Sequence, residues 1–371
     1  MSLKKTTYPE SGLWKDYLDE KRVKAMAERI GLASSRFDPK AYVRAVMSDG
    51  YASLELKDRV KRIAYCLHDH LPSRYDDAIA VIREVAPDLG EFQNWCLTTY
   101  VELFGLEDFE ASMEALEYLT RYGTGEFAIR PFVINHTERV LQIMHRWAED
   151  DNEHVRRLAA EGSRPRGVWV AHVPSFKKDP RPVIKILDKL NDDPSLYVRK
   201  AVANNLNDIT KDNPDIAINT AKRWQKNGRA GTAWIIRHAC RTLIKQGHPE
   251  VFSLLGFTDR PKVSVRKFTT SRKRVRIGDS FRISLDIVSG AGVKQRLAVD
   301  YRLHYRKANG KLAPKVFKLT EKNLGPGETV SLATDHSFRP MTTRKHYPGP
   351  HLIEIIINGR PYGQLRFHLT A

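Results

Sequence analysis

Three carboxylates stand out in this 371-residue sequence, because helix stability does not explain two of them. Glu161 falls in the last turn of a predicted helix, just before Gly162, where a negative charge opposes the helix dipole. Asp208 is a poor helix former placed late in another predicted helix. Glu126 falls at a predicted helix start, where the dipole favours an acid, so a purely structural role is its alternative. Carboxylates gathered in one site can stabilise a developing positive charge or orient a water molecule.

The motifs of several common chemistries are missing. No glycine-rich phosphate loop, H-E-x-x-H motif or paired C-x-x-C motif is present, so neither nucleotide hydrolysis nor zinc chemistry is indicated. Cys66, Cys96 and Cys240 are odd in number and widely spaced, which predicts buried free thiols rather than disulfides.

The carboxylates belong to a repeated helical pattern. In D-P-S-L-Y-V-R-K-A-V-A-N-N-L-N-D-I-T-K (193–211), apolar residues recur at three- and four-residue steps and form one stripe of an amphipathic helix. A related text, D-N-E-H-V-R-R-L-A-A-E-G, lies 43 residues earlier, and a weaker copy, W-I-I-R-H-A-C-R-T-L-I, lies 38 residues later. This spacing is typical of HEAT-like helix pairs. Superposing the first two copies places Glu161 on Asn204, so Glu161 and Asp208 should line one polar surface with Arg157 and Lys200.

Residues 1–256 are predicted to form a stacked α-solenoid. Their apolar residues recur at helical spacing with short links and no strand-like alternation. The predicted helices cover 12–30, 39–47, 54–70, 75–85, 92–104, 106–122, 126–135, 137–148, 152–161, 182–190, 194–210, 214–226 and 230–246.

One predicted loop, 162–180, is longer than a repeat connection requires and too rich in proline and glycine for a helix. Basic residues surround Trp169 in this loop, an interleaving common in proteins that bind nucleic acids. They are Arg164, Arg166, Lys177 and Lys178. The alternative for Trp169 is an apolar plug that holds the loop down.

Residues 257–371 change to short alternating runs separated by turn signals such as Asn309-Gly310 and Asn358-Gly359. This pattern predicts a small immunoglobulin-like β-sandwich without its disulfide. Its densest basic cluster is our candidate for a DNA-contacting edge and contains Arg272, Lys273, Arg274 and Arg276. The alternative is a solvated edge strand protected by charge against aggregation.

The formal net charge of +18 is concentrated in the predicted β domain. Residues 257–371 carry 23 Lys and Arg against 8 Asp and Glu, whereas residues 1–256 carry 39 against 36. Such asymmetry favours nucleic acid as the partner, with an acidic protein or a membrane surface as alternatives. No apolar run is long enough to span a membrane, and the N-terminus lacks the apolar segment of a signal peptide, so we expect a cytoplasmic protein.

Four motifs together point to a known family. They are T-G-E-F-A-I-R-P-F, D-N-E-H-V-R-R-L-A-A-E-G-S-R-P-R, G-V-W and V-R-K-A-V-A-N-N-L-N-D-I-x-K-D, and they cover about 124–212. The combination resembles the AlkC type of DNA alkylation-repair glycosylases. The predicted β-sandwich fits the longer AlkC architecture rather than the shorter AlkD one.

The resemblance implies a monofunctional glycosylase that acts on double-stranded DNA containing alkylated bases, and we expect the protein to be a monomer. Its substrates would be bases made cationic by alkylation, such as 3-methyladenine and 3-methylcytosine, and it would need no metal or organic cofactor. By position, Glu126, Glu161 and Asp208 match the family's active-site carboxylates, and Trp169 matches its aromatic contact. The resemblance also implies excision without a base-flipping pocket.

The implied chemistry agrees with the residues. A cationic base is already a good leaving group, so the enzyme must stabilise the sugar cation that develops, with Asp208 orienting the attacking water. Trp169 would gain on the order of 1–2 kcal/mol from a cation–π contact. The side chains expected to hold the flanking phosphates are Arg156, Arg157, Arg164, Arg166, Arg199 and Lys200. The rival hypothesis is a non-enzymatic nucleic-acid-binding scaffold, since HEAT-like solenoids mostly bind other macromolecules.

Overall fold

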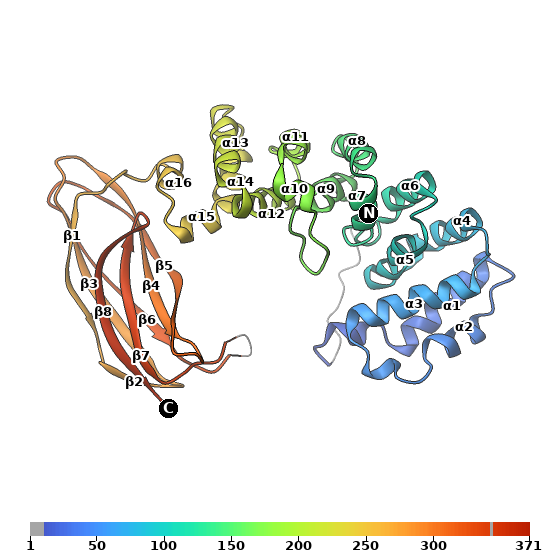
Figure 1. Cartoon of the computed structure of the whole chain (residues 1–371), viewed down its shortest axis with the longest axis horizontal. Coiled ribbons are helices and arrows are strands. Elements are labelled where there is room, and N and C mark those ends of the chain that lie inside the picture. The colour runs from blue at the N-terminus through green and yellow to red at the C-terminus, as the bar shows by residue number, and fades with distance from the viewer. Residues whose placement is uncertain (1–10, 342–343) are drawn as a thin grey trace. The chain divides into compact units, whose positions relative to one another are not determined.

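The computed structural model describes residues 11–341 and 344–371. The N-terminal residues 1–10, where no signal segment was expected, therefore lie outside the described residues. The chain divides into two compact units, one ending at Ala239 and the other comprising Cys240–Ala371. The first unit is helical and the second is mainly β (Figure 1). The predicted order, a helical solenoid followed by a β-sandwich, is confirmed.

The first unit is a series of helices joined by short links. In chain order they are η1 (Trp14–Tyr17), α1 (Glu20–Ala33), α2 (Pro39–Val46), η2 (Tyr51–Ser53), α3 (Leu56–His70), α4 (Tyr75–Val85), η3 (Ala86–Asp88), α5 (Glu91–Phe104), α6 (Phe109–Leu119), α7 (Ile129–Asn135), α8 (Thr137–Trp147), α9 (Glu153–Gly162), α10 (Pro174–Lys178), α11 (Arg181–Leu190), α12 (Leu196–Asp212), α13 (Pro214–Lys226) and α14 (Thr232–Ala239).

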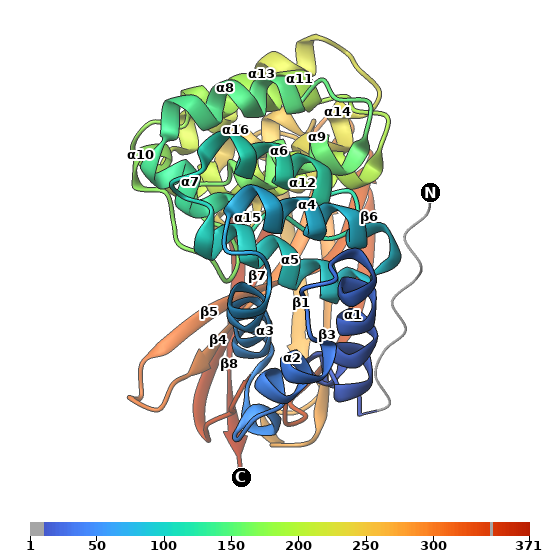
Figure 2. The same cartoon turned by 90° about the vertical axis from the view of Figure 1, so that its right-hand side faces the viewer.

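The helices of this unit form two layers. Figure 1 shows α4, α6, α8, α11 and α13 in one row and α3, α5, α7, α9, α12 and α14 in a second row on the inner side of the curve. The view turned by 90° again shows α8, α11 and α13 on one side of α9 and α12 (Figure 2). Within the inner row α12 packs on both α9 and α14. Each helix thus buries its apolar face against its neighbours, as in other solenoids.

Helix α12 begins at a serine cap, because the Ser195 hydroxyl accepts a hydrogen bond from the Tyr197 backbone N–H at 3.2 Å. Its predicted apolar stripe is buried and consists of Val198, Ala201, Val202, Leu206 and Ile209. Asn205 joins this helix to α9, since its side-chain amide donates to the Ala160 carbonyl at 2.8 Å and to the Ser163 hydroxyl at 3.0 Å. The relative position of α9 and α12 is therefore fixed by both packing and hydrogen bonds.

Two local expectations are corrected. The segment 162–180 contains the short helix α10. Pro174 is its first residue, a position where a backbone N–H would have no partner within the helix, so the absence of this N–H does not destabilise the helix. The predicted helix 230–246 is divided into α14 and α15 (Arg241–Gln246), with Cys240 between them in a non-helical conformation.

The second unit contains two β-sheets preceded by two short helices. Its elements are α15, α16 (Pro249–Leu254), β1 (Val263–Thr270), β2 (Arg274–Arg276), β3 (Ser280–Ser289), β4 (Gln295–Arg306), β5 (Leu312–Leu324), β6 (Thr329–Ser337), β7 (Gly349–Ile357) and β8 (Arg360–Thr370). One sheet has the order β1-β3-β6 and the other β2-β8-β7-β4-β5. Alternate residues of β3, β4 and β7 enclose the core between the sheets. The basic strand β2 is an edge strand, paired in parallel with β8.

The two helices of the second unit pack on the β structure. Phe252 of α16, Phe257 and Ala298 of β4 form a small buried cluster. Asn358 binds the same region, because its side chain accepts from the Ala298 backbone N–H at 2.6 Å and donates to the Thr258 carbonyl at 2.8 Å. The compact units consequently divide between Ala239 and Cys240, before the change in composition at 256/257 that the sequence shows.

Burial keeps the cysteines unreactive. Cys66, Cys96 and Cys240 are all buried and free, as predicted. Burial raises the pKa of the Cys240 thiol to about 12, so this thiol is protonated at neutral pH. Among the helices of the described residues, none combines the length and apolar character required to cross a membrane.

The turn between β7 and β8 yields a stability prediction. Asn358 and Gly359 have φ values of 46° and 79°, typical of the tight hairpin turn that the Asn-Gly pair indicates. A Cβ on Gly359 would lie 2.6 Å from the Gly247 Cα and 2.8 Å from the Gly247 carbonyl oxygen. We expect Gly359→Ala to lower the free energy of unfolding of the second unit by about 2–4 kcal/mol, combining left-handed strain with overpacking.

The matched control is Gly327→Ala, whose φ is also positive at 68° but whose Cβ would meet nothing within 4 Å. It should cost only about 1–2 kcal/mol. Urea unfolding followed by the β-sheet circular dichroism signal measures both variants, and equal losses would show that the contact with Gly247 contributes nothing.

Candidate active site

The structure brings Glu161 and Asp208 together through one arginine. Glu161 lies in the last turn of α9, and Asp208 lies in α12, which packs beside it. Arg164 donates from Nη1 to Glu161 Oε2 at 2.8 Å and from Nε to Asp208 Oδ2 at 2.7 Å. The juxtaposition inferred from the repeat therefore exists. The arginine between the two acids was not anticipated.

The cluster is more buried than the sequence suggested. Asp208 is only 1% exposed, and Arg164 only 9%. The second oxygen of Asp208, Oδ1, accepts from the Lys211 ammonium at 2.7 Å, and this lysine is exposed. Burial lowers the pKa of Arg164, but Glu161 and Asp208 outweigh burial and leave the pKa raised, so the arginine is charged. Instead of lining a polar surface with Arg157 and Lys200, the two carboxylates form a charge-balanced network with Arg164 and Lys211.

Glu126 is the third carboxylate, and it lies in the turn that precedes α7. Its Oε2 accepts from Arg157 Nη2 at 2.5 Å, and its side chain is 25% exposed, more than either other carboxylate. The Arg157 guanidinium also lies over the ring of Tyr197, 4.8 Å from its centroid. Burial lowers the pKa of Arg157, whereas Glu126 and Tyr197 raise it by more, so this arginine is charged as well.

Arg130 organises the loop that follows α9, a role that the sequence did not reveal. Its guanidinium is buried and donates to the carbonyls of Gly162, Arg164 and Ala171. Burial, with a contribution from Arg164, lowers the pKa of Arg130 to about 10, so it remains protonated at neutral pH. The motif T-G-E-F-A-I-R-P-F contains this arginine, but only the folded chain shows that it binds three carbonyls.

Trp169 projects from this loop. Its side chain is 66% exposed, and its φ is +62°, an unusual value for a residue with a Cβ. The Lys57 ammonium of α3 donates to the Trp169 carbonyl at 2.6 Å. The alternative interpretation of Trp169 as a buried plug is therefore wrong, and the indole is available to a ligand.

Several arginines expected to hold phosphates have internal partners instead. Arg156 binds both oxygens of Asp193, at 2.7 and 3.1 Å, and Arg166 binds both oxygens of Asp212, at 2.6 and 2.7 Å. Arg199 donates to the carbonyls that precede α12. Arg164 is occupied by the two carboxylates. These four guanidinium groups stabilise helix ends and the loop, because a buried charge requires a partner.

The lysines are better placed for phosphate. Lys178 and Lys200 are exposed, and Lys177 is half-buried. In the second unit Arg272, Lys273, Arg274 and Arg276 are all exposed around the edge strand β2, and Arg272 contacts Asp279 at 3.5 Å. This basic edge has the exposure that a DNA contact or a protected edge strand would require.

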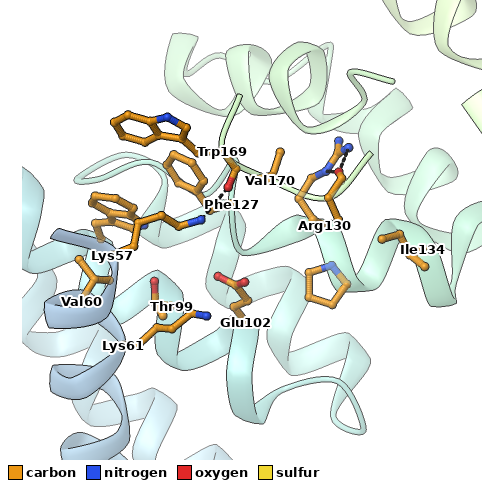
Figure 3. A pocket seen from close by; sticks show the side chains of 13 residues that line it. Lys57, Val60, Lys61, Thr99, Glu102, Phe127, Arg130, Ile134, Trp169 and Val170 are labelled. Atoms are coloured by element: carbon orange, nitrogen blue, oxygen red, sulfur yellow. Dashed lines mark hydrogen bonds between the residues drawn. The ribbon is translucent and has the colours of Figure 1, made fainter. Parts of the chain in front are cut away.

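A cavity of about 280 Å³ adjoins the Trp169 loop within the helical unit. Figure 3 shows that α3, α5, the α7 region and the loop contribute its walls. Trp95, Phe127 and Trp169 are among the lining residues. Among the described residues, no group of three or more His, Cys, Asp or Glu side chains is arranged to hold a metal ion.

Comparisons with known proteins cover nearly the whole chain. Residues 123–243 match the family model described as DNA alkylation repair enzyme, and residues 264–371 match the C-terminal Ig-like domain of the uncharacterised protein YhaZ. The chain is 38% identical over 355 residues to the protein YhaZ of Bacillus subtilis (strain 168), in a match that covers 96% of this chain and 99% of that relative. It is also 38% identical to the solved alkylpurine DNA glycosylase AlkC of Pseudomonas fluorescens, bound to DNA containing an abasic site analog. That match has a TM-score of 0.92 and covers 97% of this chain and 100% of that one.

The buried network gives a second stability prediction. We expect Arg164→Met to lower the free energy of unfolding of the helical unit by about 3–5 kcal/mol, because it leaves two carboxylates close together and partly unpaired in a buried place. Arg166→Met removes a more exposed bidentate pair and should cost about 1 kcal/mol. Urea unfolding followed by helical circular dichroism compares them. Similar losses for the two variants would contradict a central role for Arg164.

Proposed function

Because this chain belongs to the AlkC-like family of DNA alkylation repair proteins, we propose that it is a monofunctional DNA glycosylase for cationic alkylated bases. Its substrates would be bases such as 3-methyladenine and 3-methylcytosine in double-stranded DNA. The observation that carries the proposal is the 38% identity over the full length of a DNA-bound alkylpurine glycosylase. The carboxylates of the Arg164 network supply a chemical basis that is independent of this match.

The proposed reaction is hydrolysis of the bond between the sugar C1′ and the base nitrogen. The electron pair of this bond passes to the cationic base, and positive charge develops on the sugar. Glu126 and Glu161 pair with arginines through Oε2, and we assign their Oε1 atoms to the side facing the sugar. A fixed negative charge in a partly dry site stabilises such a cation more strongly than water does.

Asp208 is assigned to the attacking water, with one added condition. Both of its oxygens are paired, and only the partner of Oδ1 is an exposed, flexible lysine. A DNA phosphate near Lys211 would compete for its ammonium group and free Oδ1 for a water molecule. The exposed indole of Trp169 would face the lesion, where a cation–π contact is worth on the order of 1–2 kcal/mol once water is excluded.

The second candidate is a nucleic-acid-binding scaffold without activity. It is favoured by the charge balance of the network, because Arg157, Arg164 and Lys211 neutralise the three carboxylates. Such a protein would bind methylated DNA without releasing base. Incubating the purified full chain with methylated DNA and detecting free 3-methyladenine therefore separates the two candidates.

We expect Glu161→Gln to slow single-turnover release of 3-methyladenine by roughly 100-fold or more, because it removes a charge that acts only as the sugar becomes cationic. Binding to abasic-site DNA should change little. Asp212→Asn is the matched control, since Asp212 pairs with Arg166 at the end of α12 and has no assigned part in the reaction. Equal release rates for both variants would remove Glu161 from the mechanism.

Lys200, an exposed lysine of α12, tests the proposed DNA-binding surface. Lys200→Ala should weaken binding to duplex DNA and reduce the slope of log affinity against log salt by about 0.9, the value for one lost phosphate contact. Lys226→Ala removes an exposed lysine from α13 in the other row and should leave the slope unchanged. A slope altered equally by both would show only a general charge effect.

A further inference from the structure

The cavity beside the Trp169 loop has the features of a site for a planar ring. It lies between α3, α5, α7 and the loop, and its volume of about 280 Å³ is just below the range occupied by drug-sized ligands. Trp95 and Phe127 stack on one another with centroids 4.9 Å apart and an angle of 27° between their planes. Trp169 lines the cavity and Phe127 directly follows Glu126 in the chain, so the cavity lies beside two residues of the proposed reaction site.

A partly buried acid provides a directional contact in this cavity. Figure 3 shows Glu102 and Thr99 projecting from α5 toward the side of the loop that carries Trp169. Burial raises the pKa of Glu102, whereas Lys61 and Lys57 lower it by less. A carboxylate accepts hydrogen bonds from the exocyclic amino group of a base, and both adenine and cytosine carry such a group. A carbonyl at that position would be repelled.

The charges of the residues that line the cavity favour the neutral form of an alkylated base over its cationic form. Lys57, Lys61 and Arg130 contribute three cations against the single carboxylate of Glu102. A base that is cationic while attached to DNA is therefore disfavoured in the cavity. When the C1′–N bond breaks, its electron pair neutralises the ring, while water adds to C1′ and releases a proton to solvent. The departed base is neutral and no longer meets this repulsion.

We propose that this cavity binds the excised, neutral, amino-bearing base after the glycosidic bond is broken. The proposal rests on the proposed glycosylase function and adds a place for its leaving group. The aromatic wall stacks on the ring, and Glu102 accepts its amino group. Because the cavity favours the neutral form, it holds the released base after water has added to C1′.

Binding of free 3-methyladenine to the full chain, in the presence of duplex DNA containing an abasic-site analog, tests this directly. Trp95 and Trp169 line the cavity, so quenching of tryptophan fluorescence reports occupancy. We expect saturable quenching by 3-methyladenine and at least roughly 10-fold weaker binding of 3-methylhypoxanthine, in which a carbonyl replaces the amino group. Glu102→Gln should weaken binding of 3-methyladenine by roughly 10-fold.

The matched control is Glu107→Gln, an exposed acid in the link after α5. It should bind 3-methyladenine as the unaltered chain does. Single-turnover excision should be unchanged in Glu102→Gln, because this acid acts on the base only after bond cleavage. Inhibition of repeated turnover by added 3-methyladenine should weaken in parallel with binding.

The outcomes separate this inference from the glycosylase function. Release of base from methylated DNA without saturable binding of free base, or with binding that Glu102→Gln leaves unchanged, overturns the cavity assignment and retains the enzyme. Binding that depends on Glu102 without any release of base overturns the glycosylase function. In that case the cavity is a site that binds a nucleobase, but it does not bind a product of excision.

Discussion

The ion pairs of Arg164 set the constraint on which the rest of the site depends. One guanidinium binds carboxylates from α9 and α12, and none of the three groups has enough solvent around it to be stable alone. The two helices must therefore meet in one register, since displacement by a helical turn is about 5.4 Å and would break the contact between Arg164 and Asp208. Asn205 and the buried stripe of α12 maintain that register. The packing that stabilises the solenoid therefore also fixes the geometry of the site.

This arrangement also changes how negative charge is presented to a substrate. The acids are held by internal cations, so the site is close to neutral as a whole but strongly polarised across a short distance. A neutral site does not repel the phosphates of DNA, as an unpaired acidic cluster would. A cation that develops beside the carboxylate oxygens still interacts with the nearest charges first. In the proposed reaction, a polyanion can therefore bind the same surface that stabilises the carbocation.

The sequence predicted the elements well and the interior of the site poorly. Apolar periodicity in 194–210 indicated the buried stripe of α12, and superposition of the two repeats correctly placed Glu161 near Asp208. The direction of the Arg164 side chain could not be predicted in the same way. This residue lies in a loop rich in proline and glycine, which has no periodic pattern to indicate where a side chain points. Arg130 was hidden for a related reason, since its partners are backbone carbonyls, which every residue possesses. The cavity requires side chains from α3, α5 and α7 to converge, and only tertiary structure supplies that information.

The hydrogen bond from the Asn207 side chain to the Ala239 carbonyl, 2.6 Å long, lies at the C-terminal edge of the helical unit. Stacked repeats expose unsatisfied groups at their ends, and terminal repeats usually need a specialised cap. Here a side chain from the preceding inner helix, α12, satisfies the last carbonyl of α14. Side-chain amides of α12 therefore hold both of its neighbours in the inner row, Asn205 on α9 and Asn207 on α14.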